Sequence, residues 1–317
     1  MSDAMDRAVE AVLTECLNVR SGENVLIVTD PNKSAIARAI LEGARAMGAE
    51  AVLAEMSERA TNGTEPPPQI AAAMLGADVF IAPTTKSLSH TEARRLACEK
   101  GARAATMPDI TEDMMIRTMD IDWPALVKRS ASVAELLTKG NVVHITTEIG
   151  TDVTLSIEGR QGIVDDGRLR EAGSFGNLPA GEGFIAPVEG KTNGRIVFDG
   201  SIWPVGVLNE PLIIDIEDGY ARGFSGPEAE RFKTMLGEYG DDAFAVAELG
   251  IGTNEKAQLT GNVLEDEKIL GTIHVAFGDN HSFGGVIRVS SHQDGIVLKP
   301  TLTVDSEALL TQGRMLI

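Results

Sequence analysis

The sequence predicts an α/β protein in which a parallel sheet precedes a β-rich region. From Asn24 to about Met107, short continuous apolar runs alternate with segments of helical periodicity, as expected of strands buried on both faces with helices between them. After Gly140 the helical segments nearly disappear, and short strand-like runs follow one another. The length of 317 residues and the hydrophobic content of 43% suit one large domain or two ordinary ones.

The first region is expected to contain four strands with helices between them. The strands are expected at residues 24–30, 51–56, 78–83 and 103–107, and the helices at 34–48, 68–76 and 89–101. Gly48 and Gly101 lie where helix C-caps are expected, and Ser89 to Glu92 reads as a capping box. This alternation implies a Rossmann-like parallel sheet with helices on both sides.

A longer helix closes this region, and β-structure follows it. The helix is expected over residues 123–140, with Pro124 in its first turn. Strands are then expected within residues 141–159, 194–202, 211–226 and 295–305, with a single helix at 226–240. We place the domain boundary near residue 140. The prediction is an α/β scaffold domain at 1–140 and a β-rich α+β domain at 141–317.

Charge and composition exclude several classes of partner. The net charge is −19 and the acidic excess lies mainly after residue 139, which argues against nucleic acid and anionic membranes as partners. No apolar run approaches the ~20 residues of a membrane helix, and the N-terminus does not resemble a signal peptide, so a cytoplasmic location is expected. Cys16 and Cys98 lack CxxC spacing, so neither a disulfide framework nor a thiolate metal site is indicated.

The first domain is not expected to bind a nucleotide. The turn after the first strand reads "TDPNKS" and lacks the glycine patterns that cradle phosphates. We therefore expect this domain to serve as scaffold and as one wall of a cleft.

Three side chains in the C-terminal part are candidates for metal binding. His292 and Asp294 stand two residues apart, and on an extended segment alternate side chains point to the same face. Both could reach one ion. His274 lies 18 residues before His292 in "GTIHVAFG", a strand-like run. Each of these signals is weak alone, because a lone histidine among apolar residues is more often a core group.

Two glutamates in apolar surroundings complete the set. Glu182 lies in the Gly/Pro-rich stretch "NLPAGEGFIAP", and Glu248 is the only charged residue in "FAVAELGI". A buried carboxylate is costly unless it is paired or binds a metal. Two imidazoles and three carboxylates suit one or two divalent transition metals rather than a closed thiolate site. Two such ions can polarise a carbonyl and activate water, so hydrolysis is the natural reaction.

The motifs "NLPAGEGFIAP", "AELGIGTN", "GTIHVAFG" and "HQD" resemble, in this order, those of the aminopeptidase T and aminopeptidase S family. The likeness extends to "TTKSLSHTEARRLACEKGARAATMP" in the first domain. It implies a metalloaminopeptidase, acting on small peptides, with two divalent ions (Zn, Co or Mn) and a homodimeric assembly. The ligands that it implies are Glu182, Glu248, His274, His292 and Asp294.

Two departures from that family concern catalysis. Its members have a tyrosine at the position of His281 and a glutamate at that of Ile269, where Glu267 stands two residues upstream. We hypothesise that His281 acts as acid/base or orients the reacting group, since an imidazole exchanges protons near neutral pH. Glu182 is a second catalytic candidate, although the sequence leaves open which carboxylate bridges the ions and which is the general base. His90, after the third strand, is a candidate for binding substrate.

Two alternative functions stay open. The same fold family includes 2,5-dihydroxypyridine 5,6-dioxygenase, a mononuclear iron enzyme that keeps the HxD pair, has histidine where this chain has Glu248, and lacks counterparts of Glu182 and His274. An Fe(II) triad of two histidines and one carboxylate could be built here from His274, His292 and Asp294. A catalytically inert metal-binding protein is the third alternative, but the ligand set exceeds what structural zinc needs.

Overall fold

The described part of the chain, residues 3–317 of a computed structural model, divides into two units. The first unit runs to Trp123 and includes Gly167–Ala180; the second comprises Pro124–Asp166 and Gly181–Ile317. A single boundary near residue 140 was expected. The long helix α6 (Trp123–Lys139) belongs with the second unit because its Val133 and Leu137 are buried in the core of that unit's sheets.

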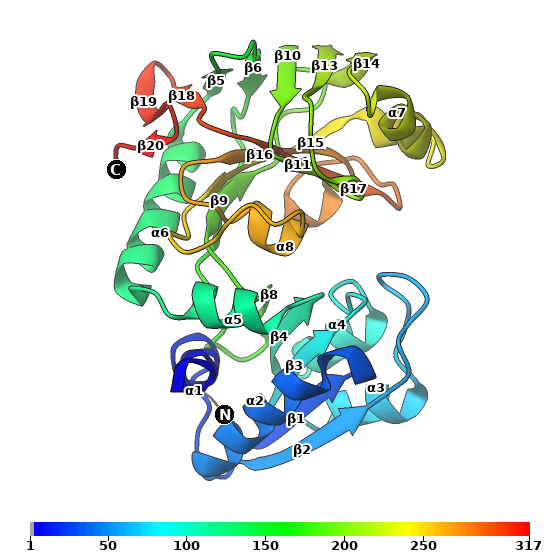
Figure 1. Ribbon diagram of the computed structural model, residues 1–317, viewed down its shortest axis with the longest axis vertical. Helices are drawn as coiled ribbons and strands as arrows, with labels where there is room; N and C mark the ends of the chain where they lie inside the picture. Colours follow the sequence, from blue (N-terminus) through cyan, green and yellow to red (C-terminus); the bar gives the residue numbers. More distant parts are fainter. Residues whose placement is uncertain (1–2) are drawn as a thin grey trace. The chain divides into compact units, whose positions relative to one another are not determined.

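The first unit contains the predicted parallel sheet (Figure 1), and the α/β fold class is confirmed. Its strand order is β2-β1-β3-β4-β8 and every neighbouring pair is parallel. The strands are β1 (Asn24–Thr29), β2 (Glu50–Glu55), β3 (Val79–Thr84), β4 (Arg103–Pro108) and β8 (Phe175–Asn177). The edge strand β8 was missed because its three residues contain no apolar run.

Three of the described helices of the first unit lie where helices were predicted, at 34–48, 68–76 and 89–101, whereas the first and the last were not predicted. The described helices are α1 (Asp3–Ala11), α2 (Ser34–Ala46), α3 (Pro68–Met74), α4 (Glu92–Glu99) and α5 (Glu112–Met119). Gly48 and Gly101 have φ of +83° and +108°, so both occupy the left-handed position after a helix that was predicted. The prediction of a capping box that begins at Ser89 was wrong. The N-cap is Thr91, whose hydroxyl accepts a hydrogen bond from the Arg94 amide.

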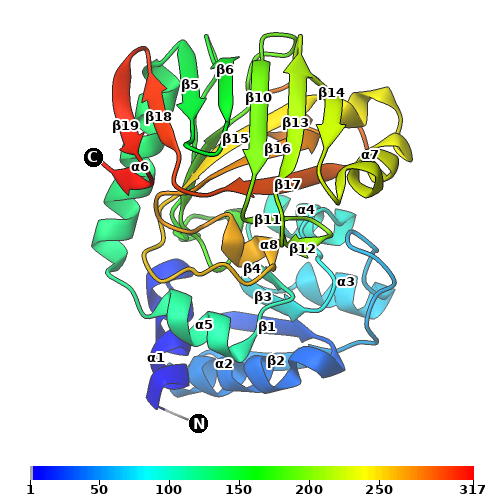
Figure 2. The same ribbon diagram turned by 45° about the horizontal axis from the view of Figure 1, so that its top comes forward.

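The second unit consists mainly of two antiparallel sheets. The larger sheet (Figure 2) has the order β14-β13-β10-β6-β5-β18-β19-β20 and the other β12-β11-β17-β16-β15-β9-β7. The strands of the larger sheet are β5 (Val142–Thr146), β6 (Asp152–Ser156), β10 (Asn193–Phe198), β13 (Leu212–Glu217), β14 (Tyr220–Ser225), β18 (Thr301–Val304), β19 (Glu307–Thr311) and β20 (Arg314–Met315). Those of the other sheet are β7 (Ile163–Asp165), β9 (Glu182–Ile185), β11 (Ser201–Ile202), β12 (Gly206–Val207), β15 (Val246–Gly252), β16 (Ile273–Gly278) and β17 (His292–Val297).

Three helices accompany these sheets. The expected helix at 226–240 is α7 (Ala229–Gly237), and the long helix before the sheets is α6. A short third helix, α8 (Val263–Asp266), was not expected because four residues carry no periodic signal. Two 3-10 turns, Asp241–Phe244 and His281–Phe283, complete the unit.

The core of the second unit gathers apolar side chains from both sheets. Leu249 and Ile251 of β15 and Val275 and Phe277 of β16 are buried in it, together with Ile196 of the larger sheet. These positions alternate along each strand, so the seven-stranded sheet turns one face to the core and leaves the other free for different residues. Both cysteines are buried and form no disulfide. Among residues 3–317, no helix has the length and apolar character needed to cross a bilayer.

Candidate metal centre

The sheet face opposite the core carries the five side chains that the sequence singled out. They come from four adjacent strands, β9, β15, β16 and β17. Cross-strand partners share a face, and Gly250 pairs with His274, Ala276 with Asp294, Gly278 with His292, and Gly252 with Glu182. Glu248 also pairs with Ala276, so each of the five predicted side chains stands opposite a glycine or alanine on at least one neighbouring strand. These small residues leave room above the strands for a cluster of polar groups.

Glu248 lies at the centre of this cluster and contacts both histidines. Its Oε1 is 3.1 Å from His274 Nε2 and its Oε2 is 3.5 Å from His292 Nε2. Glu182 Oε2 is 3.2 Å from the same nitrogen of His274, and Asp294 Oδ1 is 3.4 Å from His292 Nε2. The cluster thus has two imidazole positions, and one carboxylate spans them.

Three overlapping sets of ligand atoms, each within 4.8 Å of one another, occur in the described residues. They are Glu182, Glu248 and His274; Glu248, His292 and Asp294; and Glu267, His274 and Asp294. None of these sets from residues 3–317 contains both histidines. The iron triad of His274, His292 and Asp294 that the sequence allowed is therefore not among the three sets. The reason is that the two imidazoles lie on either side of Glu248.

The two histidines are held differently. His292 Nδ1 lies 2.8 Å from the backbone oxygen of Asp279, so this nitrogen donates and Nε2 is free to bind a metal. The ring of His292 also contacts that of Phe283, with a centroid distance of 5.8 Å. His274 Nδ1 is buried without a hydrogen-bond partner. Its ring is held instead by the space over Gly250, where a β-carbon would lie 2.0 Å from Cε1.

A lysine that the sequence did not single out completes the cluster. The side chain of Lys268 is 2% exposed, and its Nζ lies 2.5 Å from Glu182 Oε1, 2.7 Å from Glu267 Oε1 and 3.3 Å from Asp165 Oδ2. Glu267 was named only as a substitute for a missing glutamate, and it does lie beside His274 and Asp294. Nothing in the sequence was a reason to select Lys268 or Asp165, because each lies among other charged residues, as solvent-exposed charges commonly do.

Burial and charge act against each other on the pKa values of the cluster. Burial alone would lower the pKa of His274, but Glu182 and Glu248 outweigh it and raise that pKa to about 9. Burial likewise opposes protonation of His292, but the nearby carboxylates of Asp294 and Glu248 outweigh it and raise the pKa of His292 to about 10. For Asp294, burial favours the neutral acid, yet His292 keeps the pKa of this carboxyl below its ordinary value. Without metal, both imidazoles are therefore cationic at neutral pH.

His281 lies outside the three ligand sets. It is exposed at the start of the 3-10 turn His281–Phe283, and its Nε2 accepts a hydrogen bond from the Arg288 guanidinium. Two residues later, Phe283 packs against the ring of His292. His281 therefore belongs to a segment that contacts a predicted ligand, but its own side chain points to a different partner.

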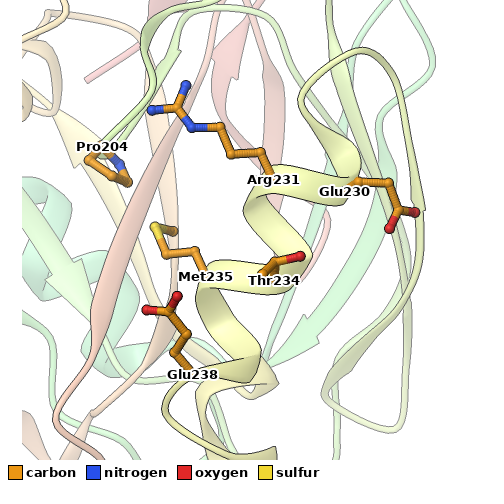
Figure 3. A pocket seen from close by; sticks show the side chains of 6 residues that line it. All are labelled: Pro204, Glu230, Arg231, Thr234, Met235 and Glu238. Carbon is orange, nitrogen blue, oxygen red and sulfur yellow. The ribbon is translucent and has the colours of Figure 1, made fainter.

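The remaining predicted residue, His90, lies in the first unit and is exposed in the turn before α4. A groove of about 490 Å³ lies in the second unit, between α7 and Pro204 (Figure 3). None of the predicted site residues lines it. Its lining consists of Pro204, Glu230, Arg231, Thr234, Met235 and Glu238.

The donor set of the cluster fits divalent metal ions. Glu182 Oε2 is buried and accepts no hydrogen bond, so one carboxylate oxygen of the cluster is free to bind a cation. Imidazole nitrogens and carboxylate oxygens suit zinc, cobalt, manganese or iron, and no thiolate is present to favour a structural zinc site. The ligands also converge from four strands of one sheet, which gives them a rigid support.

Comparisons with known proteins point to two kinds of relative. Residues 4–317 match the family model described as NicX, 2,5-dihydroxypyridine 5,6-dioxygenase. The structure of 2,5-dihydroxypyridine dioxygenase from Pseudomonas putida KT2440 is 19% identical with a TM-score of 0.85, covering 100% of this chain and 98% of that chain. Wild-type AmpT from Thermus thermophilus is 17% identical with a TM-score of 0.73, covering 99% of both chains. A comparison with curated protein sequences gives no match.

Proposed function

The chain belongs to the 2,5-dihydroxypyridine 5,6-dioxygenase family, and within that family we propose that it is a hydrolase using two divalent ions, of the aminopeptidase type. One observation carries this proposal. The two oxygens of Glu248 face two different imidazoles, at 3.1 and 3.5 Å. A carboxylate between two nitrogen ligands is the arrangement expected of a residue that bridges a pair of ions.

The two ligand sets that share Glu248 would each hold one ion. Glu182 and His274 would complete the first site, and His292 and Asp294 the second. We expect zinc, cobalt or manganese, in keeping with the N/O donor set. A pair of such ions supplies an activated water at neutral pH and polarises a carbonyl group.

The protein's own side chains divide the remaining tasks. Glu182 Oε1 is held by Lys268, so only Oε2 is available and Glu182 serves as a ligand rather than as general base. Glu267 Oε1 is likewise held by Lys268, but Glu267 lies outside the two ligand sets that would hold the ions, so its other oxygen is the candidate for accepting a proton. The free amino group of a small peptide would be drawn to one of the ions. His281 is proposed to exchange a proton with the leaving amine, which requires its side chain to turn away from Arg288, its partner in this structure.

Family membership favours a second function, a mononuclear iron dioxygenase acting on a hydroxylated pyridine. A single Fe(II) would occupy the set Glu248, His292 and Asp294, which lies within ligand distance. This set has one imidazole and two carboxylates, whereas the iron triad of many oxygenases has two imidazoles and one carboxylate. The dioxygenase reading also assigns no role to Glu182 or His274.

Metal analysis joined to two activity assays tests the proposal. The protein is purified without added metal, and its metal content is measured before and after loading with zinc, cobalt or manganese. We expect two equivalents per chain and cleavage of aminoacyl-arylamides. One equivalent of iron, with oxygen uptake on 2,5-dihydroxypyridine and no arylamide cleavage, would overturn the proposal in favour of the dioxygenase.

A further inference from the structure

We propose that the ammonium group of Lys268 is a permanent cation of the metal centre. It occupies the position that a further divalent ion would take among Asp165, Glu182 and Glu267, and it thereby limits the centre to two ions. This inference rests on the two-ion function proposed above, and it makes Lys268 a positioning residue rather than a catalytic one.

The contacts of Lys268 are those of a bound cation. Three carboxylates from three separate segments surround Nζ, at 2.5 Å from Glu182, 2.7 Å from Glu267 and 3.3 Å from Asp165. An ammonium group has three hydrogens to donate, and three acceptors are provided. A buried charge of this kind is stable only when it is paired and hydrogen-bonded. The three carboxylates form a cage around the ammonium, and its positive charge offsets part of their repulsion.

Hydrogen bonds fix the backbone from which the Lys268 side chain extends. The amide of Lys268 donates to the Glu265 oxygen at 2.9 Å, and its carbonyl accepts from the Asn254 amide at 2.9 Å. Glu265 is itself fully buried and accepts a hydrogen bond from the Gln258 amide at 2.7 Å. The backbone of Lys268 is therefore hydrogen-bonded at both its amide and its carbonyl, and the three carboxylates hold the end of its side chain.

Charge balance gives the same ion number. When all five carboxylates of the cluster are ionised, as metal binding requires, one ammonium leaves four negative charges, and two divalent ions with neutral imidazoles would neutralise these. With the ammonium removed, a fifth negative charge is uncompensated, and it lies where three carboxylates already converge. The carboxylates of the cluster are Asp165, Glu182, Glu248, Glu267 and Asp294.

The ammonium also determines how Glu182 meets a metal. Because Glu182 Oε1 is bound to Lys268, only Oε2 points toward His274, from which it is 3.2 Å distant. Glu182 can therefore bind an ion through one oxygen only. Without Lys268, both oxygens become available, and the cage can take a cation from solution.

Lys268→Met tests this inference, because methionine keeps much of the length and removes the charge. The wild-type protein and the variant are produced in the presence of Mn²⁺, and a desalting column removes the unbound metal. The bound manganese is then quantified by elemental analysis and electron paramagnetic resonance. We expect the variant to retain one more Mn²⁺ per chain than the wild type. Adding Asp165→Asn to Lys268→Met removes one wall of the cage and should abolish the extra ion.

An equal or smaller manganese count in Lys268→Met than in the wild type overturns the inference. Lys139→Met, at a side chain that is 71% exposed, is the matched control and should leave the count unchanged. If Lys268→Met does not fold, Lys268→Gln gives the same comparison with a polar side chain in the cage. The wild-type count tests the proposed function separately: a single ion in the wild type refutes the two-ion function, whereas the difference between variant and wild type tests Lys268.

Discussion

Gly250 and His274 face each other across β15 and β16, and the imidazole occupies the space where a side chain of residue 250 would lie. A β-carbon at position 250 would be 2.0 Å from Cε1 and 2.1 Å from Nε2 of His274. The glycine therefore determines the position of a ring whose Nδ1 has no hydrogen-bond partner. The open space over Gly250 thus orients His274, whereas His292 is oriented by the hydrogen bond that its Nδ1 donates to the Asp279 backbone oxygen.

Gly250→Ala should displace His274 and weaken metal binding. Because the methyl group cannot coexist with the ring, we expect the affinity for the ion at His274 to fall about 10- to 100-fold, the range found when the support of a ligand is lost. Calorimetric titration with Mn²⁺ measures this. Gly237→Ala, where the nearest foreign atom is 3.9 Å away, is the control and should bind as the wild type does. Unchanged affinity in Gly250→Ala contradicts the assignment of His274 as a ligand.

Glu248→Gln should impair both ion positions at once. An amide offers one oxygen, so it cannot serve the two imidazole positions that the carboxylate spans. We expect the affinity for both ions to fall by at least about 100-fold, with loss of the second equivalent in metal analysis. Glu255→Gln, at an ion pair with Arg129 in the same unit, is the matched control. Two ions bound with wild-type affinity by Glu248→Gln would show that this residue does not bridge.

The stability of the metal-free protein should fall as the pH rises from about 7 to about 10. His274 and His292 have pKa values of about 9 and about 10 in the folded protein but about 6.5 in the unfolded chain. Their stabilising contribution is complete below pH ~6.5 and is lost as the pH rises through the two folded values. Metal-loaded protein, with neutral imidazoles, should change much less over this range.

Thermal melts with chelator and with metal check this pH dependence. The expected result is a Tm of the chelated protein that decreases between pH 7 and pH 10, and a smaller decrease for the loaded protein. A chelated protein whose Tm increases over the range would mean that the imidazoles are neutral without metal. His144→Asn, at an exposed histidine paired with Asp152 on the other sheet, should leave the slope unaltered.

His281→Phe tests the proposed proton exchange. General acid/base groups contribute about 10²- to 10⁴-fold to turnover, so we expect kcat to fall by at least the lower figure while two ions remain bound. The same substitution at His144 serves as control and should have no effect. Turnover that survives His281→Phe at full metal content would leave His281 as a surface residue whose partner is Arg288.

The parallel sheet of the first unit was predictable because each of its longer strands is a continuous apolar run in the sequence. Residues 78–83, for example, contain the whole buried stretch of β3 apart from Thr84. The strands β7 and β8 have three residues each and no such run. They were missed, as was the return of Gly167–Ala180 to the first unit. That return depends on pairing of β8 with β4, a long-range contact that local patterns do not contain.

The site was partly predictable for a related reason. Glu248 is conspicuous because it is a charge in an apolar strand, and His274 stands out in the same way. Lys268 follows the acidic residues of "LEDEK", and nothing local distinguishes it from a solvated charge. Its role depends on β7 and β9 bringing Asp165 and Glu182 to it, which only the assembled sheet reveals.

Alternating residues of the strands β15 and β16 have two different roles. Leu249, Ile251, Val275 and Phe277 specify the packing of the sheet against its partner, while the residues between them specify the chemistry. Substitutions on the second set leave the first untouched. Proteins with this fold can therefore change the reaction that they catalyse through a few substitutions at every second position of these strands, while the packing of the core stays the same.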